Sequence, residues 1–150
     1  MDTVTYPDPQ VSDYIERHFV AVKAMLDLRA SAPLFRSHGI IWTPTAGFSD
    51  RNGVLHYQSV GYLPPNEFIA TLKIGRARCL MAWTRSAEAA AELAEAADME
   101  TSFCAESIYW LGIARFLQRR DTAGMWEAWD RLVALYPESS WANKIYDREA

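Results

Sequence analysis

The segment that most limits how this chain can fold runs from Trp42 to Val60, and it places a proline where a strand should begin. Proline lacks the backbone N–H that a β-ladder needs, so Pro44 fits only at the start or the edge of a strand. A short run follows it, then the turn sequence Asp50-Arg51-Asn52-Gly53 and a second run over 54–60. Asn-Gly between two such runs is typical of a hairpin. We therefore predict two antiparallel strands, the first beginning directly after Pro44.

The residues before this hairpin predict helices and one further strand. Asp8 or Asp13 can cap a first short helix through residues 14–17, and the stretch 31–39, with proline near its start, predicts a second helix. The run 19–26 is mostly apolar and lacks polar alternation, which predicts a strand covered on both faces. The expected fold class is therefore α/β, a sheet with flanking helices.

From residue 68 onward the pattern is helical. Phe68, Leu72 and Cys79 recur at helical spacing and predict a long helix that ends near Trp83. Further helices are expected over 86–98, 102–119, 121–136 and from Ser139 or Ser140 through Ile145. We expect an α/β part over residues 1–75 and an all-helical part over residues 76–150.

Residues 8–75 resemble the thioredoxin fold in the order of their parts: helix, strand, helix, the loop Trp42-Thr43-Pro44-Thr45, hairpin and terminal helix. The resemblance implies a cis peptide bond before Pro44 and a substrate peptide that pairs with the backbone of Thr43. A trans proline at a strand start is the alternative. By this resemblance Trp42, Thr43, Pro44 and Thr45 are the expected substrate-binding residues.

The Cys-x-x-Cys pair of that family, and the central strand before it, are missing from this sequence. The predicted sheet is therefore incomplete, and two of its strands would face an unpaired edge. The sheet can form in another order, a second chain can donate a strand, or the sequence is an N-terminally shortened form of a longer protein. We favour the third, because Thr5-Tyr6-Pro7-Asp8-Pro9 resembles the segment that follows Cys-x-x-Cys in thioredoxin-like proteins.

The helical part resembles one tetratricopeptide unit. Tyr109-Trp110-Leu111-Gly112 opens the match, and Trp129 would fill the gap that Leu-Gly leaves between two helices. Such helix pairs form peptide grooves, which Trp126 and Trp129 would line. Packing of these rings between the helices is the alternative, and we favour it.

Composition and charge exclude several classes of function. The formal net charge is −4, and the only dense basic cluster is Arg119-Arg120, so a nucleic-acid partner is not expected. No apolar stretch approaches the ~20 residues of a membrane span, and the first residues do not form a signal peptide. We expect a cytoplasmic protein whose two cysteines, Cys79 and Cys104, are reduced.

No residue pattern predicts a catalytic, metal or cofactor site. The three histidines, His18, His38 and His56, are scattered, with no partner at ligand spacing. Asp50 stands in a turn and is interpreted as a turn residue. No glycine-rich phosphate loop is present, so we expect no cofactor.

We predict a thioredoxin-like protein of the thiol–disulfide oxidoreductase family that is redox-inactive as given, because thiolate attack needs a suitably placed thiol. Whether it is an enzyme is therefore left open. A non-catalytic adaptor that binds peptides through the helical part is the alternative. A protein or peptide partner is expected, and a homodimer would complete the sheet.

Overall fold

A computed structural model of the chain describes residues 1–25 and 29–145. Within them the protein is a mixed α and β structure with six α-helices and one two-stranded antiparallel sheet. The helices are α1 (Pro9–His18), α2 (Ala32–Ser37), α3 (Pro65–Ala82), α4 (Ser86–Ala97), α5 (Cys104–Arg119) and α6 (Ala123–Leu135). The strands are β1 (Thr45–Ser49) and β2 (Leu55–Val60), and two single 3₁₀ turns are η1 (Arg29–Ser31) and η2 (Ala142–Lys144).

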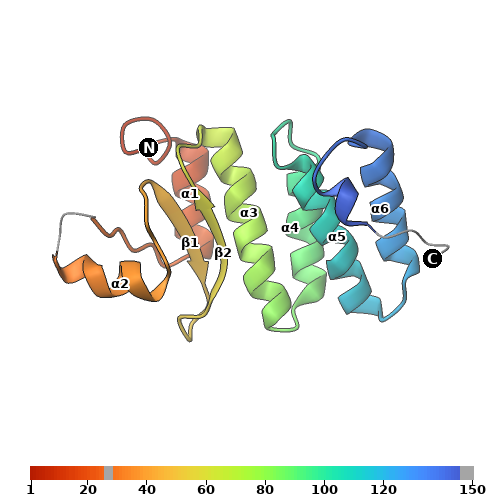
Figure 1. The fold of residues 1–150 in the computed structure, drawn as a ribbon, viewed down its shortest axis with the longest axis horizontal. Coiled ribbons are helices and arrows are strands. Elements are labelled where there is room, and N and C mark those ends of the chain that lie inside the picture. Colours follow the sequence, from red (N-terminus) through yellow and green to blue (C-terminus); the bar gives the residue numbers. More distant parts are fainter. Residues whose placement is uncertain (26–28, 146–150) are drawn as a thin grey trace.

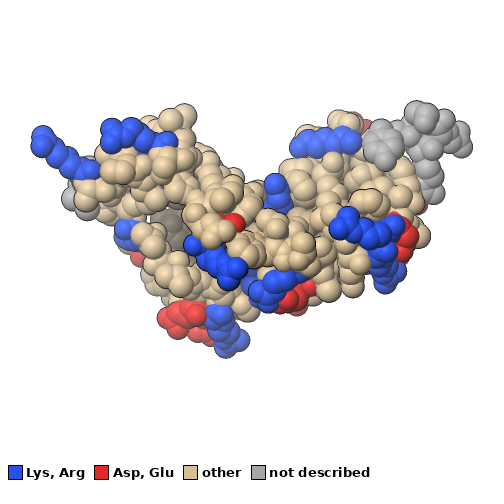
Figure 2. Space-filling model, turned by 90° about the horizontal axis from the view of Figure 1, so that it is seen from below, with Lys and Arg blue, Asp and Glu red and all other residues tan. Residues whose placement is uncertain are grey.

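From the hairpin onward the elements lie in sequence order across the molecule to α6, whereas α2 lies at the opposite end and α1 lies behind the hairpin, against α3 (Figure 1). Helices α3 to α6 run alternately down and up, since the loops between them are short. Seen from below, the molecule is hollowed on one side, between the end that carries α2 and the end that carries α6 (Figure 2).

The predicted hairpin is confirmed. β1 and β2 pair in antiparallel register, with Thr45 opposite Val60 and Phe48 opposite Tyr57. Asp50 shapes the turn between them, because its Oδ1 accepts hydrogen bonds from the backbone N–H groups of Asn52 at 2.8 Å and Val54 at 3.1 Å. This matches its interpretation as a turn residue.

The strand predicted over 19–26 is wrong. Residues 20–25 belong to no strand, although they come directly after α1, and residue 26 lies outside the described part of the chain. A strand needs a neighbour that completes its ladder, and no other described segment pairs with this one. Val20 and Val22 are consequently 96% and 79% exposed rather than covered on both faces.

Most helix predictions are confirmed, with two changes at the ends of the chain. Helix α1 begins at Pro9, and Asp8 is its cap, because its Oδ1 accepts from the N–H groups of Gln10 and Val11. The last predicted helix is only the single turn η2, whose first N–H is capped by the Ser139 hydroxyl at 3.0 Å.

Helix α3 supports two separate groups of buried side chains. Its first turns give Phe68, Ile69 and Leu72 to a cluster with α1 and β1, and its later turns give Ile74 and Leu80 to a larger cluster with α4, α5 and α6. The division expected near residue 75 therefore falls inside one continuous helix.

Candidate functional site

The peptide bond between Thr43 and Pro44 is cis, as the resemblance to thioredoxin implied. Two hydrogen bonds fix the loop to the end of the hairpin: Gly61 N–H donates to the Pro44 carbonyl at 2.8 Å, and the Thr45 hydroxyl donates to the Trp42 carbonyl at 2.7 Å. The loop therefore enters β1 directly, and the four residues predicted to bind substrate lie together at one end of that strand.

One edge of β1 is unpaired among the described residues. Hydrogen bonding alternates along an antiparallel pair, and Pro44 accepts from Gly61, so Pro44 and Ala46 direct their backbone groups toward β2. The N–H and C=O groups of Thr45 and Gly47 then point the other way. No described backbone hydrogen bond joins residues 20–25 to this edge, so it presents two donors and two acceptors.

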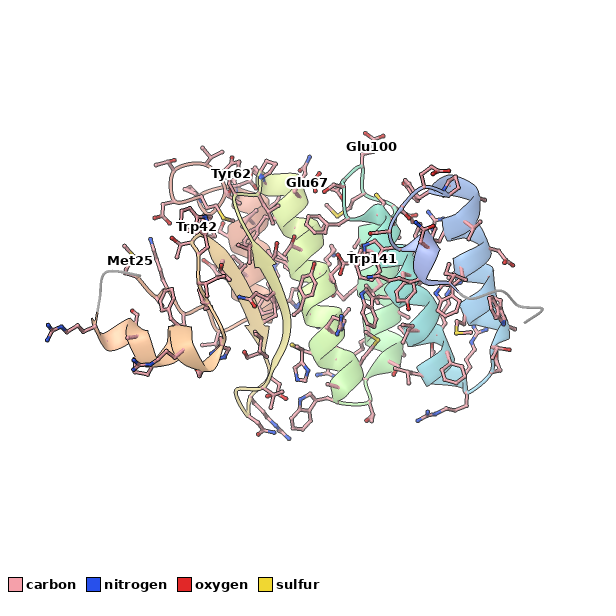
Figure 3. The ribbon with its side chains drawn as sticks, viewed as in Figure 1. Met25, Trp42, Tyr62, Glu67, Glu100 and Trp141 are labelled. Carbon is pink, nitrogen blue, oxygen red and sulfur yellow. The ribbon has the colours of Figure 1, made fainter. Side chains whose placement is uncertain are left out.

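Exposed apolar side chains lie in the loop next to this edge of β1. Ile41 and Trp42, in the loop before β1, are 91% and 66% exposed. Val20 and Val22, in the segment after α1 that belongs to no strand, are 96% and 79% exposed. Figure 3 shows Trp42 beside the end of the hairpin that also holds Tyr62, which is itself 55% exposed. Apolar surface of this kind marks a place where another polypeptide can bind.

Neither thiol is placed to act at this loop. Cys79 lines a cleft with Asp50, at the turn end of the hairpin, whereas Pro44 lies at the opposite end of β1. Burial and, to a smaller extent, the neighbouring Asp50 carboxylate raise the pKa of the Cys79 thiol to about 11, so the nucleophilic thiolate is scarce at neutral pH. Cys104 is buried at the start of α5 and donates its S–H to the Met99 carbonyl.

Of the two tryptophans considered as groove residues, Trp129 lies in the packing between α5 and α6, and Trp126 lies beside it on α6. Trp129 is 5% exposed, stacks on Tyr109 with ring centres 5.4 Å apart, and donates from Nε1 to the Tyr109 carbonyl. A Cβ atom at Gly112 would lie 2.6 Å from Trp129 Nε1, so glycine is required for this contact. Trp126 is half-buried, with its ring edge-on to Trp129. Trp129 therefore presents almost no surface to a ligand.

A comparison of the chain with protein-family models, curated proteins and solved structures finds no match. No group of three or more His, Cys, Asp or Glu side chains suited to a metal ion occurs in the described residues. Among those same residues, no helix is both long enough and apolar enough to cross a lipid bilayer.

Two groupings of side chains could not be predicted from the linear sequence. Glu106 of α5 is buried and accepts a hydrogen bond from the Tyr57 hydroxyl of β2, 49 positions earlier. Around the Asp50 turn, three arginines from separate segments line one cleft: Arg51, Arg76 and Arg85. The sequence distances between these residues give no periodic signal, because the contacts depend on how the hairpin packs against α3.

Proposed function

We propose that this chain is a thioredoxin-like protein that binds an extended peptide segment along Trp42–Thr45 and the unpaired edge of β1, without itself catalysing thiol–disulfide exchange. The observation that carries the proposal is the outer edge of β1, which no described segment pairs with, next to the exposed side chains of Ile41 and Trp42. An added strand would satisfy the N–H and C=O groups of Thr45 and Gly47, and backbone pairing of this kind supplies affinity with little demand on sequence.

The exposed apolar side chains supply the second part of the interaction. Trp42 and Ile41 stand before β1, where the side chains of an added strand would reach them. Burial of a large apolar side chain contributes roughly 1.5–3 kcal/mol. A partner with apolar side chains at alternate positions, which point to one face of a strand, is therefore preferred.

The absence of turnover rests on the positions of the thiols. Exchange requires a thiolate beside the bound disulfide. Cys79 lies at the other end of β1 from Pro44, and Cys104 is buried against the Met99 carbonyl. In an insulin-reduction assay driven by dithiothreitol, the chain should not exceed the rate without protein. Turnover that Cys79→Ser abolishes would refute this part.

Peptide binding is tested with a fluorescein-labelled octapeptide of alternating Val and Thr, followed by fluorescence polarisation. Saturable binding is expected, at least fivefold weaker for Trp42→Ala and unchanged for Val54→Ala, an exposed apolar residue at the far end of the hairpin. The same peptide N-methylated at every residue has no backbone N–H on either edge to donate to the C=O groups of Thr45 and Gly47, and it should bind at least fivefold more weakly. Equal binding of both peptides would refute pairing with β1.

Two further measurements separate the alternatives. If Trp126→Ala weakens binding and Trp42→Ala does not, the peptide binds the helical part, as an adaptor would. Sedimentation reports whether a second copy of the chain occupies the β1 edge. If a second copy occupies that edge, the protein sediments as a dimer, and the octapeptide should dissociate it.

A further inference from the structure

A cleft of about 440 Å³ opens at the turn end of the hairpin, away from the cis-proline loop. Its walls come from the C-terminal end of α1, the Asp50 turn, the last turns of α3 and the start of α4. The residues that matter for its chemistry are Asp50, Arg51, Arg76, Cys79, Trp83 and Arg85. Figure 2 views the molecule from this end and shows Lys and Arg side chains along the face, with acidic side chains among them.

The three arginines are held in place by different contacts. Arg51 lies over the Trp83 ring, with its guanidinium carbon 4.0 Å from the ring centre. Arg76 is paired with Glu92 of α4, and Arg85 donates two hydrogen bonds to Glu88, each 2.6 Å long. Fixed guanidinium groups lose less side-chain freedom when a ligand arrives, which favours binding.

The carboxylates that hold two of these arginines do not line the cleft. Glu88 and Glu92 lie outside its walls, whereas the guanidinium groups that they contact form part of them. Each guanidinium has five N–H donors, so Arg76 and Arg85 keep donors beyond those used in these pairs.

Asp50 is the acidic residue in the wall, and its oxygens are already occupied. Oδ2 accepts from His56 Nε2 at 3.0 Å and from Trp83 Nε1 at 3.1 Å, while Oδ1 accepts from two backbone N–H groups of the turn. These donors hold the Asp50 pKa at about 2, so the group carries one negative charge at neutral pH. Within the wall three guanidinium groups stand against one carboxylate, while Glu92 and Glu88 offset the charges of Arg76 and Arg85 from outside it.

We propose that this cleft binds a phosphate-type oxyanion through Arg51, Arg76 and Arg85. Guanidinium groups donate paired, parallel hydrogen bonds that match the oxygens of a phosphate group. The volume exceeds what a single phosphate fills, so the group is that of a small phosphorylated molecule. This site is separate from the peptide edge of β1, at the opposite end of the hairpin.

Binding is measured on the whole chain with inorganic phosphate at pH 7.5, at ionic strength held constant with sodium chloride. NMR titration follows the Trp83 Nε1–H signal, which lies in the cleft wall. A saturable shift is expected with phosphate. Acetate should bind with an affinity at least fivefold weaker than that of phosphate. No saturable shift, or acetate binding equal to phosphate, overturns the proposal.

Variants distinguish a site from general attraction to a basic surface. Arg51→Gln and Arg85→Gln should each weaken phosphate binding at least fivefold, because both side chains are exposed and their loss leaves the core intact. Arg119→Gln, which removes an exposed charge from the end of α5, should leave it unchanged. If Arg119→Gln weakens binding as much as Arg51→Gln, the attraction is general and the site does not exist.

Cys79 gives an independent readout, because its half-buried thiol lines the same cleft. Bound phosphate should slow alkylation of Cys79 by iodoacetamide at least threefold, with the modified cysteine identified by mass spectrometry. The protection should be lost in Arg51→Gln. Alkylation that phosphate leaves unchanged contradicts binding in this cleft, whatever the peptide assay at β1 gives.

Discussion

Substitution of Gly75 by alanine tests the contact that joins the hairpin to α3. A Cβ atom at this position would lie 2.3–2.6 Å from three carbons of the Phe48 ring. Carbon atoms in contact lie roughly 3.5–4.0 Å apart, so the ring would have to move by about 1 Å. Phe48 is buried and has Phe19 and Tyr57 beside it, with ring centres 5.7 and 5.8 Å away, which limits that movement.

The expected cost follows from two opposing effects. Overpacking of a rigid site costs about 3 kcal/mol, and alanine gains about 1 kcal/mol over glycine inside a helix. Gly75→Ala should therefore lower the free energy of unfolding by about 2 kcal/mol, or the melting temperature by roughly 4–8 °C for a chain of this size. Urea unfolding followed by circular dichroism measures the first quantity and a thermal scan the second.

A double-mutant cycle identifies the cause. In a Phe48→Leu background the smaller side chain leaves room, so Gly75→Ala should become neutral or stabilising by up to about 1 kcal/mol, a coupling of about 2–3 kcal/mol. Gly124→Ala is the control, because a Cβ atom there would lie 3.3 Å or more from the nearest side-chain carbons, those of Arg115. If Gly75→Ala stabilises the otherwise unchanged protein, the packing of β1 on α3 described here is wrong.

Two further predictions concern a buried carboxylate and a helix cap. Burial raises the Glu106 pKa above its usual value, so ionisation costs the folded state more than the unfolded one. The stability of the unchanged protein relative to Glu106→Gln should therefore fall as pH rises from 4 to 7 in urea unfolding, and a constant difference would contradict this. Asp8→Ala removes the acceptor for Gln10 N–H and Val11 N–H and should cost about 1 kcal/mol, or roughly 2–4 °C in melting temperature. Asp8→Asn keeps an acceptor, and equal loss in both variants would show that capping is not the reason.

The sequence predicts most strongly where a few neighbouring residues determine the backbone. Asp50 and the Asn-Gly that follows it fix the turn through local hydrogen bonds, and the helices follow from apolar periodicity and short connections. The cis bond before Pro44 was implied by resemblance and is confirmed. Its use as a peptide-binding loop remains a prediction.

Predictions failed where the outcome depends on distant partners. The apolar run at 19–26 has the composition of a buried strand, but a strand forms only beside another, and the described residues offer none. The cleft lined by Arg51, Arg76 and Arg85 was missed for the same reason, since these residues come together only after β1 and β2 pack on α3. The local pattern of the sequence does not predict contacts between segments that lie this far apart in the chain.

The position of α3 between two apolar clusters limits how the chain can be divided into fragments. Because side chains on its successive turns belong to different apolar clusters, removal of either flank leaves several of them facing water. A fragment cut at residue 75 would interrupt the helix between Ile74 and Ala77, both fully buried. The protein should then melt in a single cooperative transition, and neither half should be transferable to another protein without a substitute for the surface that α3 loses.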